Sequence, residues 1–201
     1  HRENIIEIPR ADFIKKVDEI KVIKEEMDIT QGKLVMGYRC NVDYKDEFKY
    51  YSLFVGSNVL GGGPHSKLFV NVREKESLCY YIYSSLEKYK TSMFISSGIE
   101  SENYDKTVEL IGEQLKSLKE GKISDEELLN SKSAIISSLK TIKDSLGGSS
   151  DFYFSQSMGG TNTTVEKIIE MIEKVTVSDI VEAFKNIELD TIYFLSNNKE
   201  A

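Results

Sequence analysis

Residues 60–81 read LGGGPHSKLFVNVREKESLCYY, and this stretch fixes the order of the elements expected around it. The three consecutive glycines end one helix, and we expect them to form a helix-ending turn that needs positive φ. Pro64 suits the first turn of a second helix, whose apolar side carries Leu68, Phe69 and Val72. The residues after the charged run REKES are rich in β-formers, so a strand should follow the second helix.

The segments on either side extend this pattern. Upstream, residues 33–40 (KLVMGYRC) predict a strand, and the apolar residues that follow Asp46 recur at helical spacing as far as the glycines. Downstream, residues 78–86 and 93–99 are rich in β-forming residues and are joined by a polar stretch. A hairpin is the simplest interpretation of that pair.

The C-terminal half is predicted to be helical. The first helix there has an apolar stripe made of Tyr104, Val108, Ile111, Leu115 and Leu118. A second begins at the capping-box pattern SDEE (124–127), with a stripe that runs as far as Leu146. Two shorter helices begin at Thr163 and Thr176, each of which has an acidic residue three positions later. The chain closes with a strand at residues 191–195, TIYFL.

This order of elements predicts the fold class. Strands, then several helices, then a final strand imply an α+β fold: a mainly antiparallel sheet with helices layered on one face. The final strand is expected to pair centrally with the early strands. Residues 4–26 alternate apolar and charged groups, which predicts a linker segment with some helix at residues 1–27, followed by a single domain at residues 28–201.

Composition excludes several classes of partner. The 201 residues include 26 Lys+Arg against 33 Asp+Glu, a formal charge of −7, so nucleic acid is not an expected partner. No apolar stretch approaches the roughly 20 residues that span a bilayer, and the N-terminus lacks a signal-peptide core, so no membrane partner is expected. Cys40 and Cys79 are isolated, which predicts a reducing, cytoplasmic location.

Catalytic and metal-binding motifs are scarce. With His1 and His65 as the only histidines, the H-E-x-x-H and H-x-x-E-H zinc-protease motifs cannot occur. The spacing of Cys40, His65 and Cys79 follows no zinc pattern, so we expect no metal in this chain. The same scarcity leaves no cysteine–histidine nucleophile pair. The glycine-rich turn lacks the Lys-Ser/Thr ending of a P-loop, which excludes a nucleotide site.

The same 60–81 stretch resembles the signature of the non-catalytic domain of the M16 peptidase family, which includes pitrilysin, insulin-degrading enzyme and the mitochondrial processing peptidases. The shared features are the glycine-rich turn, a Ser-x-Leu-Phe helix (66–69), an Arg-Glu-Lys run (73–75) and a strand entered through Leu-x-Tyr (78–80). The resemblance covers about residues 28–196. It implies the half-domain fold of the LuxS and mitochondrial-processing-peptidase-like metallohydrolases.

Within that resemblance, Arg73 and Tyr80 match the family's Arg/Tyr pair, which reaches towards substrate held at a zinc site on another domain. A guanidinium presents fixed donors to a peptide carbonyl, and a phenol can donate to the oxyanion that develops on the scissile carbonyl. The resemblance therefore implies substrate and transition-state contacts for both residues. On chemistry alone, the favoured interpretation is structural, with Arg73 as a charge at a helix C-terminus and Tyr80 as a packed strand residue. The family pattern on both sides of the pair reverses this preference.

The missing zinc motif implies that catalysis takes place elsewhere. Either the chain is the C-terminal domain of a subunit whose own first domain carries the zinc, or its subunit pairs with a catalytic subunit as a heterodimer; the Arg/Tyr pair favours the second. The expected function is to bind extended peptide substrate and support zinc-dependent proteolysis by the M16 catalytic domain or subunit. The alternatives are a structural or assembly subunit with no proteolytic role and, more weakly, a small independent hydrolase.

Overall fold

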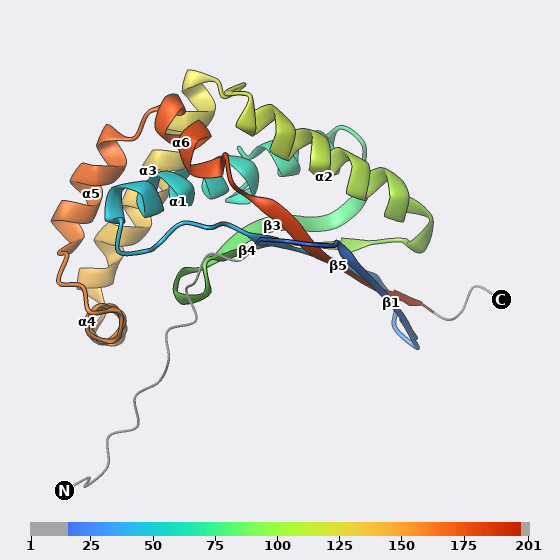
Figure 1. Ribbon diagram of the computed structural model, residues 1–201, viewed down its shortest axis with the longest axis horizontal. Helices are drawn as coiled ribbons and strands as arrows, with labels where there is room; N and C mark the ends of the chain where they lie inside the picture. The colour runs from blue at the N-terminus through green and yellow to red at the C-terminus, as the bar shows by residue number, and fades with distance from the viewer. Residues whose placement is uncertain (1–15, 198–201) are drawn as a thin grey trace, which may run out of the picture.

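Five strands form one sheet in the order β1-β5-β2-β4-β3 in the computed structural model, which describes residues 16–197 (Figure 1). The strands are β1 (Lys21–Met27), β2 (Gly32–Arg39), β3 (Cys79–Glu87), β4 (Ser92–Ile99) and β5 (Glu188–Asn197). β1 pairs in parallel with β5, and every other pairing is antiparallel. The mainly antiparallel sheet, the 79–99 hairpin and the inner position of the final strand are confirmed.

The helices cover one face of this sheet (Figure 1). They are α1 (Glu47–Gly61), α2 (Tyr104–Lys119), α3 (Asp125–Thr141), α4 (Leu146–Gly159), α5 (Val165–Lys174) and α6 (Val177–Phe184). A π-helix, η1 (Phe69–Glu74), and three 3₁₀ turns, η2 (Lys88–Lys90), η3 (Ser101–Asn103) and η4 (Ile142–Asp144), complete the set. Within residues 16–197, no helix has both the length and the apolar composition needed to cross a membrane.

The core lies between the sheet and the helices. Alternate residues of β2 are buried beneath the helices, as the period of two in a half-covered strand requires. The predicted stripe of α2 also faces inward, through Ile111, Leu115 and Leu118. The largest fully buried side chains come from both layers: Leu34, Met36, Leu53, Leu60, Leu68, Met93, Ile95, Ile99, Ile111, Leu118, Ile172 and Phe184.

Local capping explains where several helices begin. Ser124 and Glu127 form the predicted capping box of α3, and Thr176 with Asp179 forms that of α6. The cap predicted at Thr163 is wrong by one residue. Thr164 accepts the hydrogen bond from the Lys167 amide at the start of α5, while the Thr163 hydroxyl donates to the Glu47 carboxylate.

Two segments differ in kind from the sequence-based expectation. Residues 1–15 of the expected linker with some helix lie outside the described residues, but Lys21–Met27 of it form a strand, β1. The side chains of β1 are all exposed, and the strand pairs with the far end of the chain. The stripe expected to run on to Leu146 ends with α3, because a 3₁₀ turn redirects the chain into α4. Leu146 is 93% exposed there, so it takes no part in the core.

The glycine-rich turn is also built differently from the expectation. Gly62 caps α1 with φ of −88°, and the described glycines with positive φ are Gly121 and Gly160. Gly61 is needed for a close approach instead, because a Cβ there would come within 2.5 Å of the Ser84 nitrogen in β3. The glycine therefore allows α1 to end directly against an edge strand.

Candidate functional site

An open pocket of about 460 Å³ lies where η1 leads into β3. Arg73 and Tyr80, the two residues singled out in the sequence, both line it. The remaining lining comes from the end of η1, the turn that follows it, the start of β3 and the segment after β4: Glu74, Ser77, Leu78, Cys79, Glu100 and Asn103. The structure thus brings the predicted pair together at the surface, outside the packed interior.

A π-helix places Arg73 at the pocket. The Lys75 amide donates to the Val70 carbonyl at 3.1 Å, a bond across five residues that widens the last turn of η1. Ser77 then reverses the chain with φ of +54°, and its amide donates to the Arg73 carbonyl at 3.1 Å. The Arg73 guanidinium carbon lies 4.6 Å from the centroid of the Phe69 ring, which supports the side chain from one side.

A β-bulge aims Tyr80 outward. In the pairing of β3 with β4, Cys79 lies opposite Ile99 and Tyr81 lies opposite Gly98, so Tyr80 is the extra residue. Tyr80 and Tyr81 are consequently both exposed, whereas a regular strand would bury one of them. Tyr80 is 60% exposed, which contradicts the alternative interpretation of a packed strand residue.

Glu100 is the partner of Tyr80. The phenol hydroxyl donates to the Glu100 carboxylate with an oxygen–oxygen distance of 2.6 Å. This hydrogen bond, followed by the negative charge of Glu100, raises the pKa of Tyr80 above its ordinary value. Nothing in the sequence singles out Glu100, because its contact depends on the bulge and on the register of the hairpin.

The pocket combines a donor, a phenol and a carboxylate. Arg73 lines the pocket and forms no ion pair with any carboxylate in the part of the chain that the structure describes. Burial raises the pKa of the Cys79 thiol, although Ser97 and Arg73 partly oppose this shift. Such a set can hydrogen-bond both N–H and C=O groups of a peptide main chain.

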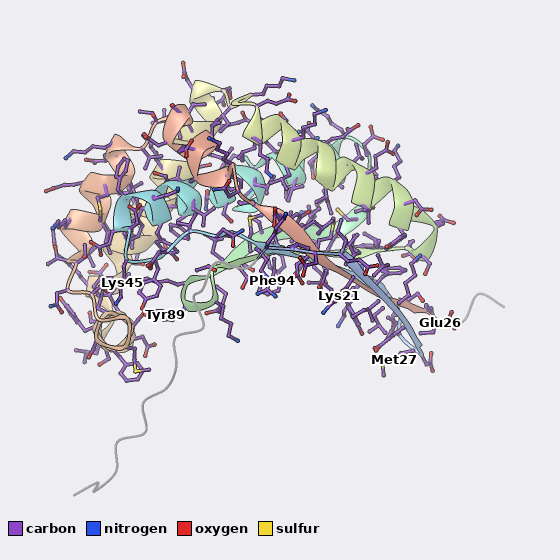
Figure 2. The ribbon with its side chains drawn as sticks, in the orientation of Figure 1. Lys21, Glu26, Met27, Lys45, Tyr89 and Phe94 are labelled. Atoms are coloured by element: carbon purple, nitrogen blue, oxygen red, sulfur yellow. The ribbon has the colours of Figure 1, made fainter. Side chains whose placement is uncertain are left out.

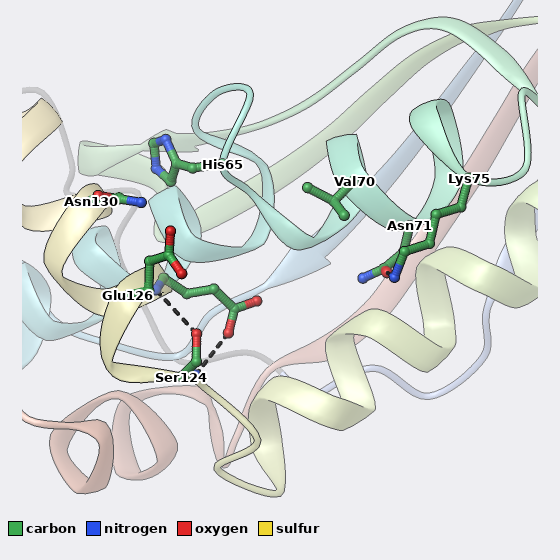
Figure 3. Close-up of a pocket in the computed structure, with 8 residues that line it drawn as sticks. His65, Val70, Asn71, Lys75, Ser124, Glu126 and Asn130 are labelled. Atoms are coloured by element: carbon green, nitrogen blue, oxygen red, sulfur yellow. Dashed lines mark hydrogen bonds between the residues drawn. The ribbon is translucent and has the colours of Figure 1, made fainter.

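A second pocket, of about 430 Å³, surrounds His65 on the helical side of the molecule (Figure 3). His65 Nε2 lies 3.2 Å from Asn58 Oδ1 and 3.1 Å from Ser131 Oγ, so one ring nitrogen links α1 to α3. Nearby, Lys67 Nζ lies 2.8 Å from Glu127 Oε1 in an ion pair whose lysine side chain is only 8% exposed. These contacts tie the glycine-rich turn to α3.

The candidate metal ligands do not meet. Cys40 and Cys79 are buried, and burial raises the pKa of Cys40 to about 12, which opposes the thiolate that zinc requires. His65 directs one nitrogen to Asn58 and Ser131, as described above. Among residues 16–197, no group of three or more His, Cys, Asp or Glu side chains is arranged to hold a metal ion. The residues described here do not fit a zinc site.

The sheet face away from the helices carries exposed apolar side chains. Phe94 and Lys21 project from this side in Figure 2. Ile23, Tyr81, Tyr83 and Phe94 are between 37% and 48% exposed, and the rings of Tyr81 and Tyr83 stack with centroids 6.0 Å apart. Apolar side chains gathered on an open sheet face are typical of a surface that meets another protein.

Comparisons with known sequences point to one family. Residues 4–135 match the family described as the peptidase M16 inactive domain. The chain is 39% identical over 197 residues to a Bacillus subtilis protein named "Probable inactive metalloprotease YmfF", covering 98% of this chain and 45% of that protein. It is 29% identical over 161 residues to the "Uncharacterized zinc protease YmxG" of the same organism, covering 79% and 39% respectively.

Solved structures show the same fold. A protein described as conserved, from Enterococcus faecalis, superposes with a TM-score of 0.87 at 32% identity, covering 93% of this chain and 44% of that one. A protease from Helicobacter pylori superposes with a TM-score of 0.81 at 20% identity, covering 98% and 48%, and shows a likeness of fold alone. The chain spans less than half the length of each of these relatives.

Proposed function

Because this chain belongs to the peptidase M16 inactive-domain family, we propose that it binds an extended peptide and supports zinc-dependent proteolysis by another domain or subunit. The observation that carries this proposal is the placement of Arg73 and Tyr80 in one open pocket. Two separate irregularities, the π-helix and the β-bulge, put them there. Irregularities of both kinds are frequent next to functional sites.

The pocket lies beside an edge strand, β3. β3 is the last strand in the sheet order, so one side of its backbone has no neighbouring strand within the described sheet. An extended peptide added along β3 would gain main-chain hydrogen bonds that tolerate varied side chains. Arg73 would donate to a peptide carbonyl, because a guanidinium carries five donors and stays charged at any working pH.

The zinc and the catalytic water belong, in this proposal, to an M16 catalytic domain or subunit. Several relatives are named zinc proteases, while the described part of this chain holds no metal-binding cluster. The matched relatives are more than twice as long as the segment they share with this chain, which leaves room for a second domain. We further propose a cytoplasmic heterodimer, in keeping with two free, buried cysteines.

Substitution of Arg73 in the complete peptidase assembly tests the proposal. Arg73→Ala should remove about 1–3 kcal/mol of transition-state stabilisation, which lowers kcat/KM by roughly 5-fold to 150-fold. Arg73→Lys should recover part of this loss, because it keeps the charge but not the planar fork. Lys75→Ala is the matched control: Lys75 is a nearby cation that donates to Asn71 and does not line the pocket. Unchanged turnover in a folded Arg73→Ala variant would refute the proposed role.

One observation favours a second candidate, a structural or assembly subunit with no proteolytic role. The apolar side chains on the open sheet face suit burial against a zinc-bearing M16 domain whether or not Arg73 contacts substrate. Peptidase activity separates the two functions. An assembly subunit would preserve activity in both the Arg73→Ala and the Tyr80→Phe variants, provided that the complex still forms.

A further inference from the structure

We infer that Tyr80 accepts a hydrogen bond from a main-chain N–H of the bound peptide, and that Glu100 is the positioning residue that holds the phenol proton. The inference rests on the proposed function and refines it. It assigns to Tyr80 a role in binding the substrate, where the resemblance implies donation to the developing oxyanion.

The Tyr80 hydroxyl already donates its proton to a hydrogen bond within the protein. A phenol has one proton, and here it points to the Glu100 carboxylate across 2.6 Å, a separation typical of a charge-assisted O–H···O⁻ bond. To donate to a substrate oxygen, Tyr80 would have to leave this carboxylate for a weaker acceptor. The lone pairs of its oxygen remain available, and polarisation by the carboxylate makes that oxygen a better acceptor.

Arg73 and Tyr80 then offer a peptide one hydrogen-bond donor and one hydrogen-bond acceptor. The guanidinium only donates, while the engaged phenol accepts. An extended main chain alternates N–H and C=O groups, so one donor and one acceptor in the same pocket match adjacent peptide units. The other charged residue lining the pocket is Glu74, next to Arg73 in sequence.

The position of Glu100 is fixed by the backbone. It directly follows Ile99, the last residue of β4, which pairs with Cys79 just before the bulge. The Asn103 side chain also donates to the Leu78 carbonyl at 3.4 Å, which ties the segment after β4 to the start of β3. Tyr80 is exposed, so packing within β3 does not fix the direction of its side chain. The hydrogen bond to the Glu100 carboxylate fixes it instead.

Ionisation of Tyr80 in the whole chain tests the bond independently of catalysis. Tyrosines labelled with ¹³C at Cζ are titrated by NMR, and Tyr80→Phe assigns the Tyr80 signal. Glu100→Gln should move the Tyr80 midpoint down towards the ordinary tyrosine value, because the negative acceptor is lost. Glu102→Gln, the same change two residues away and outside the pocket, should leave the midpoint in place. An unchanged midpoint in Glu100→Gln overturns the inference.

Steady-state cleavage of a quenched fluorescent nonapeptide by the assembled peptidase tests the acceptor role. Loss of a binding contact made equally in the ground and transition states raises KM and leaves kcat unchanged. Tyr80→Phe should therefore raise KM roughly tenfold, the equivalent of one hydrogen bond, with kcat within about twofold. Glu100→Gln should raise KM in the wild-type background and have no effect in the Tyr80→Phe background.

Two outcomes overturn the inference in different ways. A fall in kcat of Tyr80→Phe at constant KM would show that the phenol acts in the transition state, as a donor to the oxyanion would. No change in either constant would show that Tyr80 does not contact the peptide. If Arg73→Ala also leaves kcat/KM unchanged, the proposed function fails together with the inference. If Arg73→Ala lowers kcat/KM as expected, the proposed function is retained and only the inference about Tyr80 fails.

Discussion

Gly61 at the end of α1 lies directly against Ser84 of β3, and a Cβ on this glycine would come within 2.5 Å of the Ser84 nitrogen. Hydrogen bonds reinforce the contact, because the Ser84 hydroxyl donates to the Ser57 carbonyl at 2.6 Å. The strand held in this way is the one that carries Tyr80. The glycine-rich turn thus supports the pocket through packing.

Gly61→Ala should destabilise the protein by roughly 1–3 kcal/mol, because the added methyl group would come within 2.5 Å of the Ser84 nitrogen and force backbone to shift. Urea denaturation measures the change. Gly112→Ala is the matched control: Gly112 lies within α2, and a methyl group added there would meet no neighbouring atom within 4 Å. That variant should gain up to about 1 kcal/mol from helix propensity. Equal effects at the two sites would contradict the packing argument.

Glu127→Gln should cost roughly 2–3 kcal/mol of unfolding free energy, because it leaves the ammonium of Lys67 buried without its counter-charge. Glutamine can keep the capping-box hydrogen bond to Ser124, so the variant mainly removes charge. Glu120→Gln breaks the exposed pair of Glu120 with Lys122 and should leave the unfolding free energy almost unchanged, because solvent screens an exposed pair. Similar losses in the two variants, measured by urea denaturation, would show that burial of the Lys67 pair is unimportant.

The contribution of Glu127 to the free energy of unfolding should depend on pH. Burial acts to raise the pKa of Glu127, but hydrogen bonds from Lys67 and Ser124 outweigh it and hold the pKa below its ordinary value. A carboxylate with a lowered folded pKa stabilises the protein above the ordinary value of about 4.3, and this stabilisation is lost as the pH falls further. The stability difference between wild type and Glu127→Gln should therefore be full at pH 6 and shrink at pH 3.5. A difference that stays constant or grows in acid would contradict this assignment.

Thr107→Val should stabilise the protein by about 1 kcal/mol. The Thr107 hydroxyl in α2 is buried and has no hydrogen-bond partner among residues 16–197, so its removal relieves a desolvation cost without changing the side-chain shape. Both residues are β-branched, so helix propensity changes little. Thr141→Val, at a hydroxyl that donates to the Ser138 carbonyl in an exposed position, should give no gain. Thermal unfolding of the two variants makes the comparison, and a loss of stability in Thr107→Val would contradict it.

Local patterns predicted much of this fold. The stripe of α2 and the capping boxes at Ser124 and Thr176 depend on residues three or four apart, and the structure confirms them. The hairpin is equally local, because β3 and β4 are joined by a short connection. The sequence also contains the signal that leads to Arg73 and Tyr80, in the form of the family resemblance.

The remaining features depend on contacts that no local pattern reports. β1 pairs with residues about 170 positions away, so its fully exposed strand shows no alternation of its own. α4 exposes Tyr153 and Phe154 while it buries Gln156 and Gly159, the reverse of a normal apolar stripe. Glu100 meets Tyr80 only through an extra residue in β3, which spacing alone does not reveal.

Reconstitution tests the central claim, which is that this domain, whose residues 16–197 hold no metal-binding cluster, supports hydrolysis at a zinc centre supplied by another domain or subunit. The measurement is the rate of nonapeptide cleavage by the zinc-bearing partner with and without this chain, with this chain alone as the blank. The account predicts efficient cleavage only when both are present, and its loss when the zinc is chelated. Cleavage by the partner at the same rate without this chain would contradict it.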